Sequence, residues 1–309
     1  MTIRMIDEPP ASGEGEQAVT PAMPVPRWRA PMALVTSAFV VLVLLVVVVL
    51  LILKVTRGST TVQAPPVTQA GHTAVQEATS VPASAFDAVG APVGESPSPT
   101  VLSGQPSLEA GGHPEVVFVG GEFCPYCAAE RWALVVALGR FGTFSHLGST
   151  SSSKYEAFGG TATFSFDGSS YRSSYATFSP VEMYGPEPSS DAPAGFPELD
   201  KVPTPIEALL KRYDSPPFSS VGGVLPFVDV ADRLLVVGAA VGYSPGLIEG
   251  KSMSQIAGAL SDPANPVSQA ILGTANELTA AICSATGDRP QRVCDSAGVR
   301  AGTAQLGAG

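Results

Sequence analysis

The chain has 309 residues and a formal net charge of −10, with 45% hydrophobic and only 14% charged residues. This length is enough for about two domains, but the composition along the chain indicates a single folded domain with extensions. Binding to nucleic acid needs a cationic surface, and no basic run occurs anywhere in the sequence. We therefore exclude nucleic-acid partners.

The N-terminal part of the chain divides into two segments. Residues 1–31 carry acids and prolines without any apolar period, and they predict a disordered tail. Residues 32–53 are 22 consecutive apolar or small residues without a charge, which is long enough to cross a hydrocarbon core. This length and the lack of a small-residue cleavage site argue against a removed signal peptide. We expect a single-pass transmembrane helix.

Charges do not orient this segment, because Arg27 and Arg29 precede it and Lys54 and Arg57 follow it. The cysteines give the orientation instead. All four lie after the segment and their number is even, and disulfides persist outside the reducing cytosol. We expect a protein of the cell membrane whose C-terminal domain is extracytoplasmic.

Residues 54–112 are rich in Pro, Ser, Ala, Thr and Gly, which predicts a flexible linker. Residues 113–309 have a globular pattern and can bury one sizeable core. Apolar runs predict strands at 116–120, 144–147, 161–166, 171–184, 222–230 and 233–238. Helices are predicted at 125–140, 205–213, 253–260 and 267–282. The turn residues Asp167 and Gly168 predict that two of these strands form a hairpin.

The motif CPYC, from Cys124 to Cys127, stands between the apolar run 115–119 and a helical pattern. Two cysteines three apart on a first helical turn face the same way, so their sulfurs can form a disulfide or open to a dithiol. Pro125 suits the first helical position, where its missing N–H is not needed. The helix N-terminus favours the thiolate of Cys124. This pattern predicts a redox-active pair.

Two other interpretations of the motif remain open. In the first, the two cysteines form a permanent structural disulfide. In the second, they are two ligands of a zinc or iron–sulfur site. His72, His113 and His146 have no metal-ligand spacing to one another. We therefore expect neither a metal nor another cofactor.

The order of a strand, a helix led by CxxC, further strands and an apolar strand after Leu225 resembles the thioredoxin-like superfamily. The resemblance implies a cis proline packed against the active-site cysteines, and Pro226 occupies that position. A trans proline at a strand start is the alternative. The implied fold is α/β: a thioredoxin-like domain with a β-hairpin and loop insertion, preceded by one transmembrane helix and a disordered linker.

A narrower resemblance rests on FVGGEFCPYCAAERW at 118–132, TFSF at 163–166 and the paired cysteines near the C-terminus. These phrases resemble the prokaryotic family called domain of unknown function 929, from about residue 113 to residue 294. The CPYC motif is also similar to that of glutaredoxins, although only the motif and the proline strand match.

Cys283 and Cys294 enclose ten residues that are typical of a turn rather than of a metal knuckle. We expect a structural disulfide, with a second redox pair that relays electrons as the alternative. Closing such a short loop contributes roughly 3 kcal/mol in the chain-entropy account.

Proton transfer at the motif has no assigned residue. Thioredoxins often carry a buried acid six residues before the motif, but Phe118 stands there in this chain. Glu122 and Glu130 are near in sequence. Each could accept the proton through a water molecule, or be simply a solvated surface charge.

The sequence thus predicts a membrane-anchored extracytoplasmic thiol–disulfide oxidoreductase that acts on protein thiols or disulfides. Cys124 forms the mixed disulfide, Cys127 resolves it, and a membrane or extracytoplasmic redox partner resets the pair. The rival is a non-catalytic binding module whose CPYC disulfide never turns over. The missing buried acid and the insertion at 161–203 favour that rival.

Overall fold

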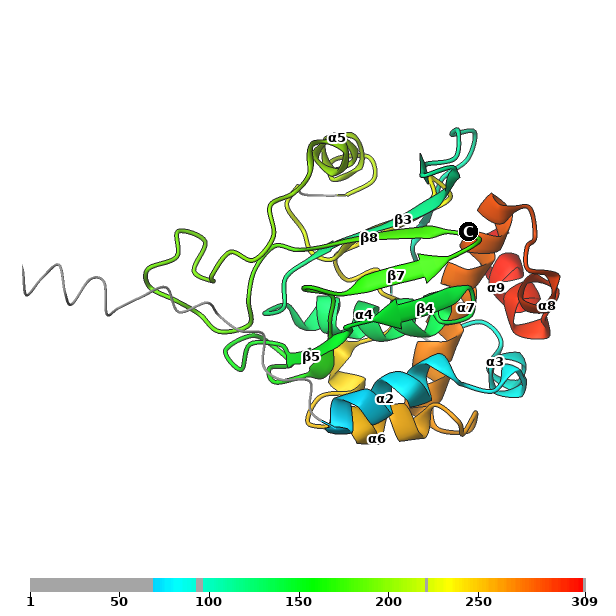
Figure 1. Cartoon of the computed structure of the whole chain (residues 1–309), viewed down its shortest axis with the longest axis horizontal. Coiled ribbons are helices and arrows are strands. Elements are labelled where there is room, and N and C mark those ends of the chain that lie inside the picture. The colour runs from blue at the N-terminus through cyan, green and yellow to red at the C-terminus, as the bar shows by residue number, and fades with distance from the viewer. Residues whose placement is uncertain (1–68, 93–96, 220–221, 308–309) are drawn as a thin grey trace, which may run out of the picture. The chain divides into compact units, whose positions relative to one another are not determined.

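The computed structural model describes residues 69–92, 97–219 and 222–307, and these form a mixed α/β domain (Figure 1). The predicted tail at 1–31 and the predicted transmembrane segment at 32–53 lie outside the described residues. The location at the membrane therefore stays a prediction.

Among the described residues, α2 and α3 precede the first strand, and α6 to α9 follow the last one. The helices are α2 (Gln69–Thr79), α3 (Ala83–Val89), α4 (Pro125–Leu138), α5 (Thr204–Tyr213), η1 (Pro245–Leu247), α6 (Met253–Ala259), α7 (Pro266–Thr286), α8 (Gln291–Cys294) and α9 (Ala297–Gly307). The strands are β1 (Thr100–Val101), β2 (Glu109–Ala110), β3 (His113–Gly120), β4 (Gly142–Ser145), β5 (Gly148–Ser151), β6 (Ala162–Ser165), β7 (Ser170–Ser173), β8 (Thr177–Glu182), β9 (Phe227–Val230) and β10 (Leu234–Val237).

The central sheet is mixed and follows the order β1-β10-β9-β3-β2, with β8 also paired to β3. β8 runs parallel to β3, and the other neighbouring pairs are antiparallel. Gly120, at the end of β3, pairs with Glu182 at the end of β8. The chain therefore leaves β3 toward the CPYC motif directly beside the end of β8.

β3 separates two hydrophobic cores because side chains alternate along a strand. Val117 and Val119 join a core that includes Leu209 and Tyr213 of α5. Val116 and Phe118 join the larger core, to which α4 and α7 contribute. Figure 1 shows α5 on one side of β3 and β8, with α4 on the other.

α4 begins at the CPYC motif for local reasons. Cys124 is the N-cap residue and its sulfur accepts the backbone N–H of Cys127, while Pro125 occupies the first helical turn. All residues of α4 except Tyr126 are buried. Trp132 donates its ring N–H to the Ala162 carbonyl at 2.9 Å and packs on Phe164, which fixes the helix against β6.

The predicted linker is wrong from residue 69 onward. Residues of the segment form α2, α3, β1 and β2, and Ala74, Ala78, Ala85 and Phe86 belong to the larger core. α2 contacts α4 and α6, and α3 contacts α7 and α9. Alanine and serine give a weak hydrophobic period, but small side chains at i and i+4 allow close helix packing. The composition of this segment is therefore typical of a linker, although the segment contains two packed helices.

The predicted hairpin at 161–184 is also wrong. β6 pairs with β5, and β7 pairs with β4, each in an antiparallel two-stranded sheet. β8, which was part of the predicted insertion, is a strand of the central sheet. Asp167 and Gly168 form a turn, but the strands on its two sides take partners from the segment 142–151, which follows α4.

These differences contradict the predicted fold of a thioredoxin-like domain with a hairpin insertion, preceded by a transmembrane helix and a disordered linker; the segment 32–53 itself lies outside the described residues. In place of the linker, α2 and α3 pack into the larger core, and β8 of the expected insertion is a strand of the central sheet. Across the ranges that the structure describes, no helix combines the length and apolar character needed to span a membrane.

Cys283 near the end of α7 and Cys294 at the end of α8 are joined by a disulfide with sulfurs 1.96 Å apart. Both cysteines are buried in the larger core. The disulfide therefore fastens α8 to the C-terminal end of the longest described helix.

Two buried glutamates interact between α4 and α7. Glu130 is fully buried and Glu277 is 3% exposed. Both oxygens of Glu130 and Oε2 of Glu277 lack a hydrogen-bond partner within the described part of the chain. Burial raises the pKa of Glu130 well above its ordinary value, and the charge of Glu277 raises it further. Burial also raises the pKa of Glu277 to about 7. These pKa shifts favour protonated carboxyls, so the helix interface disfavours their charges.

The double variant Cys283→Ser/Cys294→Ser should lose roughly 3 kcal/mol of unfolding free energy, because the open loop restores entropy to the unfolded chain. Urea unfolding at neutral pH measures this change. Reaction of Cys124 with a thiol reagent should be unchanged. Unchanged stability together with lost reactivity at Cys124 would instead support the electron-relay alternative.

Glu277→Gln should make the unfolding free energy less sensitive to pH between about 4.5 and 7. In this window the folded wild type binds more protons than the unfolded chain, so its stability falls as pH rises. Across this window, the unfolding free energy of the variant should decrease by about 2 to 3 kcal/mol less than that of the wild type. Urea unfolding across the window measures it, with the exposed Glu156→Gln as control. Parallel pH curves for both variants and the wild type would contradict the expectation.

Candidate functional site

The CPYC motif forms a dithiol at the corner between β3 and α4, with both cysteines as free thiols. The Cys124 sulfur accepts the Cys127 backbone N–H at 3.2 Å. It also lies 3.7 Å from the Leu225 carbonyl oxygen, to which the thiol donates. One side of Cys124 is thus held by the first helical turn, and the other by the segment before β9.

The two cysteines differ in exposure and in acidity. Cys124 is 7% exposed and Cys127 is fully buried. A side-chain hydrogen bond from Cys127 lowers the pKa of Cys124, and the Cys127 backbone N–H and the Arg131 charge lower it further, against the effect of burial. Burial raises the pKa of Cys127 well above its ordinary value, and the Cys124 hydrogen bond and charge add to this rise. Cys124 is therefore the sulfur that ionises first.

Pro226 is buried directly before β9, and the Leu225–Pro226 peptide bond is cis. The fold brings this segment to Cys124 across 101 positions of sequence. The segment of Leu225 and Pro226, directly before β9, thus lies beside Cys124 of the motif. Cys283 and Cys294 form their separate disulfide between α7 and α8.

Glu122 is buried rather than solvated. It is 7% exposed and accepts hydrogen bonds from the hydroxyls of Ser165 and, at 3.2 Å, Thr150. Burial raises the pKa of Glu122, although the Ser165 hydrogen bond and the Arg131 charge oppose this rise. Glu130 is buried against Glu277, as described above. Both acids that the sequence placed near the motif are therefore internal groups.

Arg131 and Glu182 form a buried ion pair that sequence reasoning missed. Both side chains are fully buried, and Arg131 donates to the two carboxylate oxygens of Glu182 at 2.7 and 2.6 Å. The backbone N–H of Phe166 donates to the same carboxylate at 3.2 Å. A signal was present, because Arg131 lies four residues after Cys127 on the same predicted helix. Its partner on β8 gave no signal.

The residues of the corner that stay partly exposed are aromatic. Phe123 stacks on Phe196 with ring centroids 4.2 Å apart, and Tyr184 lies 6.2 Å from Phe123. Tyr126 meets Phe158 edge-on at 6.4 Å. Partly exposed aromatic rings therefore flank Cys124 on both sides in the sequence.

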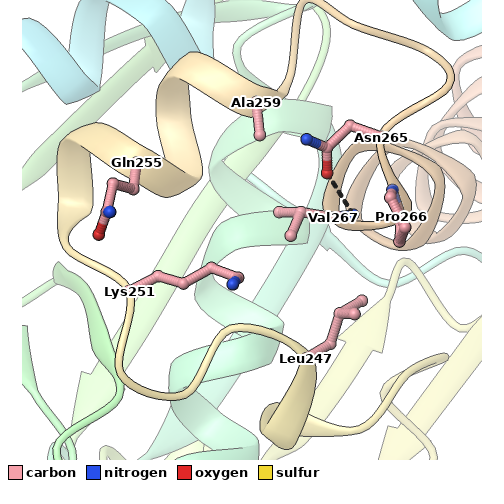
Figure 2. Close-up of a pocket in the computed structure, with 7 residues that line it drawn as sticks. All are labelled: Leu247, Lys251, Gln255, Ala259, Asn265, Pro266 and Val267. Carbon is pink, nitrogen blue, oxygen red and sulfur yellow. Dashed lines mark hydrogen bonds between the residues drawn. The ribbon is translucent and has the colours of Figure 1, made fainter.

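A pocket of about 280 Å³ lies between η1, α6 and the start of α7, and Figure 2 shows its lining side chains. The Asn265 side chain accepts the Val267 backbone N–H at 2.9 Å, drawn as the dashed line in Figure 2. This contact already uses one of the free N–H groups of the α7 N-terminus. The lining residues include none of the predicted site residues. In the ranges that the structure describes, no three His, Cys, Asp or Glu side chains are grouped to hold a metal ion.

Residues 101–284 match the family model of Domain of unknown function (DUF929). The match includes the CPYC motif, Pro226 and Cys283, and it ends before Cys294. It begins earlier than the resemblance at residue 113, which agrees with the position of β1 in the central sheet. Neither the search of curated proteins nor the search of solved structures found a match. The matched residues are more than half of the sequence, so the chain belongs to the DUF929 family.

Proposed function

We propose that this protein is a thiol–disulfide oxidoreductase that acts on protein thiols or disulfides through Cys124 and Cys127. The observation that carries the proposal is the unequal pair of sulfurs at the start of α4. Cys124 accepts the Cys127 N–H, and its pKa is lowered, whereas Cys127 is fully buried and its pKa is raised. A nucleophilic and a resolving cysteine need this difference.

The reaction proceeds in two exchanges. The Cys124 thiolate attacks a substrate disulfide, a Cys124–substrate disulfide forms, and one substrate sulfur leaves as a thiolate. The Cys127 thiolate then attacks the Cys124 sulfur, the Cys124–Cys127 disulfide forms, and the second substrate sulfur leaves. Two electrons pass from the protein dithiol to the substrate, and the two protein protons reach the substrate thiolates through solvent. The opposite direction oxidises substrate thiols by the same steps.

The Cys283–Cys294 disulfide supports an oxidising, extracytoplasmic compartment, because such bonds persist outside the reducing cytosol. A redox partner in that compartment resets the Cys124–Cys127 pair after each cycle. The relative reduction potentials of the pair, the substrate and this partner set the direction of the net reaction.

The second candidate is a binding module whose Cys124–Cys127 bond does not turn over. The low exposure of Cys124, at 7%, favours it, because a substrate sulfur must reach that atom. The stacked ring of Phe196 on Phe123, the residue before Cys124, also favours it. The two candidates differ in whether Cys124 reacts in the folded protein.

Cys127→Ser should trap mixed disulfides between Cys124 and protein substrates, since the resolving sulfur is gone. Non-reducing electrophoresis and mass spectrometry of cells that express the variant measure these species. Cys124→Ser is the matched control and should trap none, because the remaining sulfur is fully buried. Absence of mixed disulfides in both variants would support the binding module.

Alkylation of Cys124 should follow a pH profile whose midpoint lies below that of an ordinary thiol, about 8.5. Cys127→Ala should move this midpoint upward, because the side-chain hydrogen bond from Cys127 is the largest cause of the low pKa of Cys124. Iodoacetamide rates from mass spectrometry measure both profiles. A midpoint that does not move in Cys127→Ala would show that the two thiols do not interact.

A further inference from the structure

Arg131 is a fully buried cation that lies on the same helix as the two sulfurs. Cys124, Cys127 and Arg131 occupy positions i, i+3 and i+7, which share one face of a helix. Phe118 connects this face to β3, because the Arg131 guanidinium carbon lies 5.4 Å from the centroid of its ring. A Cβ atom placed on Gly120 would lie 3.3 Å from the Cys127 sulfur and would clash with the Phe118 ring. The sulfur and the ring therefore pack around the same glycine.

The ion pair is satisfied unequally. The Glu182 carboxylate accepts two bonds from Arg131 and one from the Phe166 N–H. By contrast, Nη1 of Arg131 has no hydrogen-bond partner among residues 69–92, 97–219 and 222–307. A buried ion pair rarely stabilises a fold more than apolar side chains of the same volume do. Packing alone therefore does not explain this charge beside the motif.

We infer that Arg131 is a positioning residue for thiol–disulfide exchange: Glu182 holds its guanidinium beneath the CPYC motif, where the charge stabilises first the Cys124 thiolate and then the Cys127 thiolate. The role of Arg131 in catalysis rests on the proposed function. Its electrostatic effect on the two thiols is independent of that function.

The order of the two ionisations follows from the groups around each sulfur. The Arg131 charge lowers the pKa of both cysteines, while the hydrogen bond and charge of Cys124 raise the pKa of Cys127. Once Cys124 enters a mixed disulfide, it carries no charge and these two opposing causes disappear. The Arg131 charge then acts on Cys127 against burial alone. The Arg131 charge thus stabilises the Cys127 thiolate at the step in which Cys127 attacks the mixed disulfide.

The other titratable groups around Arg131 are Glu182 from β8 and Glu122 from the segment before α4, and both interact with its charge. Glu122 is held by the hydroxyls of Ser165 and Thr150. Measuring the thiols in a Glu122→Gln background removes this carboxyl, so that the pH dependence of alkylation reports the thiols without a contribution from Glu122.

The test compares the full-length wild type with Arg131→Gln/Glu182→Gln, which removes both charges together and leaves no unpaired buried ion. The pKa of Cys124 comes from the pH dependence of iodoacetamide alkylation. The double variant should have about tenfold less Cys124 thiolate at neutral pH. In a single-turnover reaction with Ellman's reagent, its release of the second thionitrobenzoate, which reports attack by Cys127, should also slow about tenfold.

Two variants serve as controls. Arg140→Gln removes a partly buried guanidinium that lies just beyond the C-terminal end of α4 and donates to Asn276. It is about 24 Å from Cys124 along the helix axis. It should leave the Cys124 thiolate fraction unchanged. Arg131→Lys keeps the charge and should restore most of the fraction that the double variant loses. If this double variant does not fold, Arg131→Met/Glu182→Leu, which replaces the ion pair by apolar side chains, provides a second measurement, and its Cys124 thiolate fraction should also fall about tenfold.

An unchanged thiolate fraction in the variants that lack both charges, or an equal loss in Arg140→Gln, would each overturn the role of Arg131. The failure of the proposed function gives a different result. In that case the thiol pKa still follows the charge at residue 131, but Cys127→Ser traps no protein substrate.

Discussion

α4 is enclosed by protein on nearly every side, and this burial governs the rest of the structure. Every residue of the helix except Tyr126 is buried, including Glu130 and Arg131. A buried charge must be paired or neutralised, because its transfer out of water costs several kcal/mol. Arg131 is paired by Glu182, whereas burial favours the protonated form of Glu130. The two neighbouring residues thus meet the same constraint in different ways.

The same burial makes electrostatics strong at the motif. Charges interact more strongly where water is excluded, so the single cation of Arg131 can affect both sulfurs. The helix corner leaves Cys124 at the edge of this environment and Cys127 inside it. The resulting inequality between the thiols is the feature on which both the proposed reaction and the role of Arg131 rest.

Enclosing α4 requires segments from distant parts of the chain. α2 and α3 come before the sheet in sequence, α7 comes after it, and all three contribute to the core around α4. On the opposite face of the sheet, α5 packs on Val117 and Val119 and closes the second core. The residues that were assigned to a linker are therefore part of the core that encloses α4.

Local patterns in the sequence determined α4, β3, the corner between them and the pairing of Cys283 with Cys294. These features follow from short-range rules: a buried strand needs an apolar run, a helix needs a cap, and a short loop brings two cysteines together. The CPYC motif was also enough to order the two thiols by exposure. Contacts between distant segments were not determined in this way.

Only the tertiary structure decided that β6 and β7 pair with β5 and β4, that β8 lies beside β3, and that α2 belongs to the core. It also placed Glu182 against Arg131 and buried Glu122. Such contacts depend on which surfaces meet after the chain folds, and weakly periodic segments such as α2 carry little information about their partners. The sequence by itself therefore identified the two sulfurs of the candidate site, and the fold supplied the buried charge on the same helix, because a pairing across 51 positions exists only once α4 and β8 are in contact.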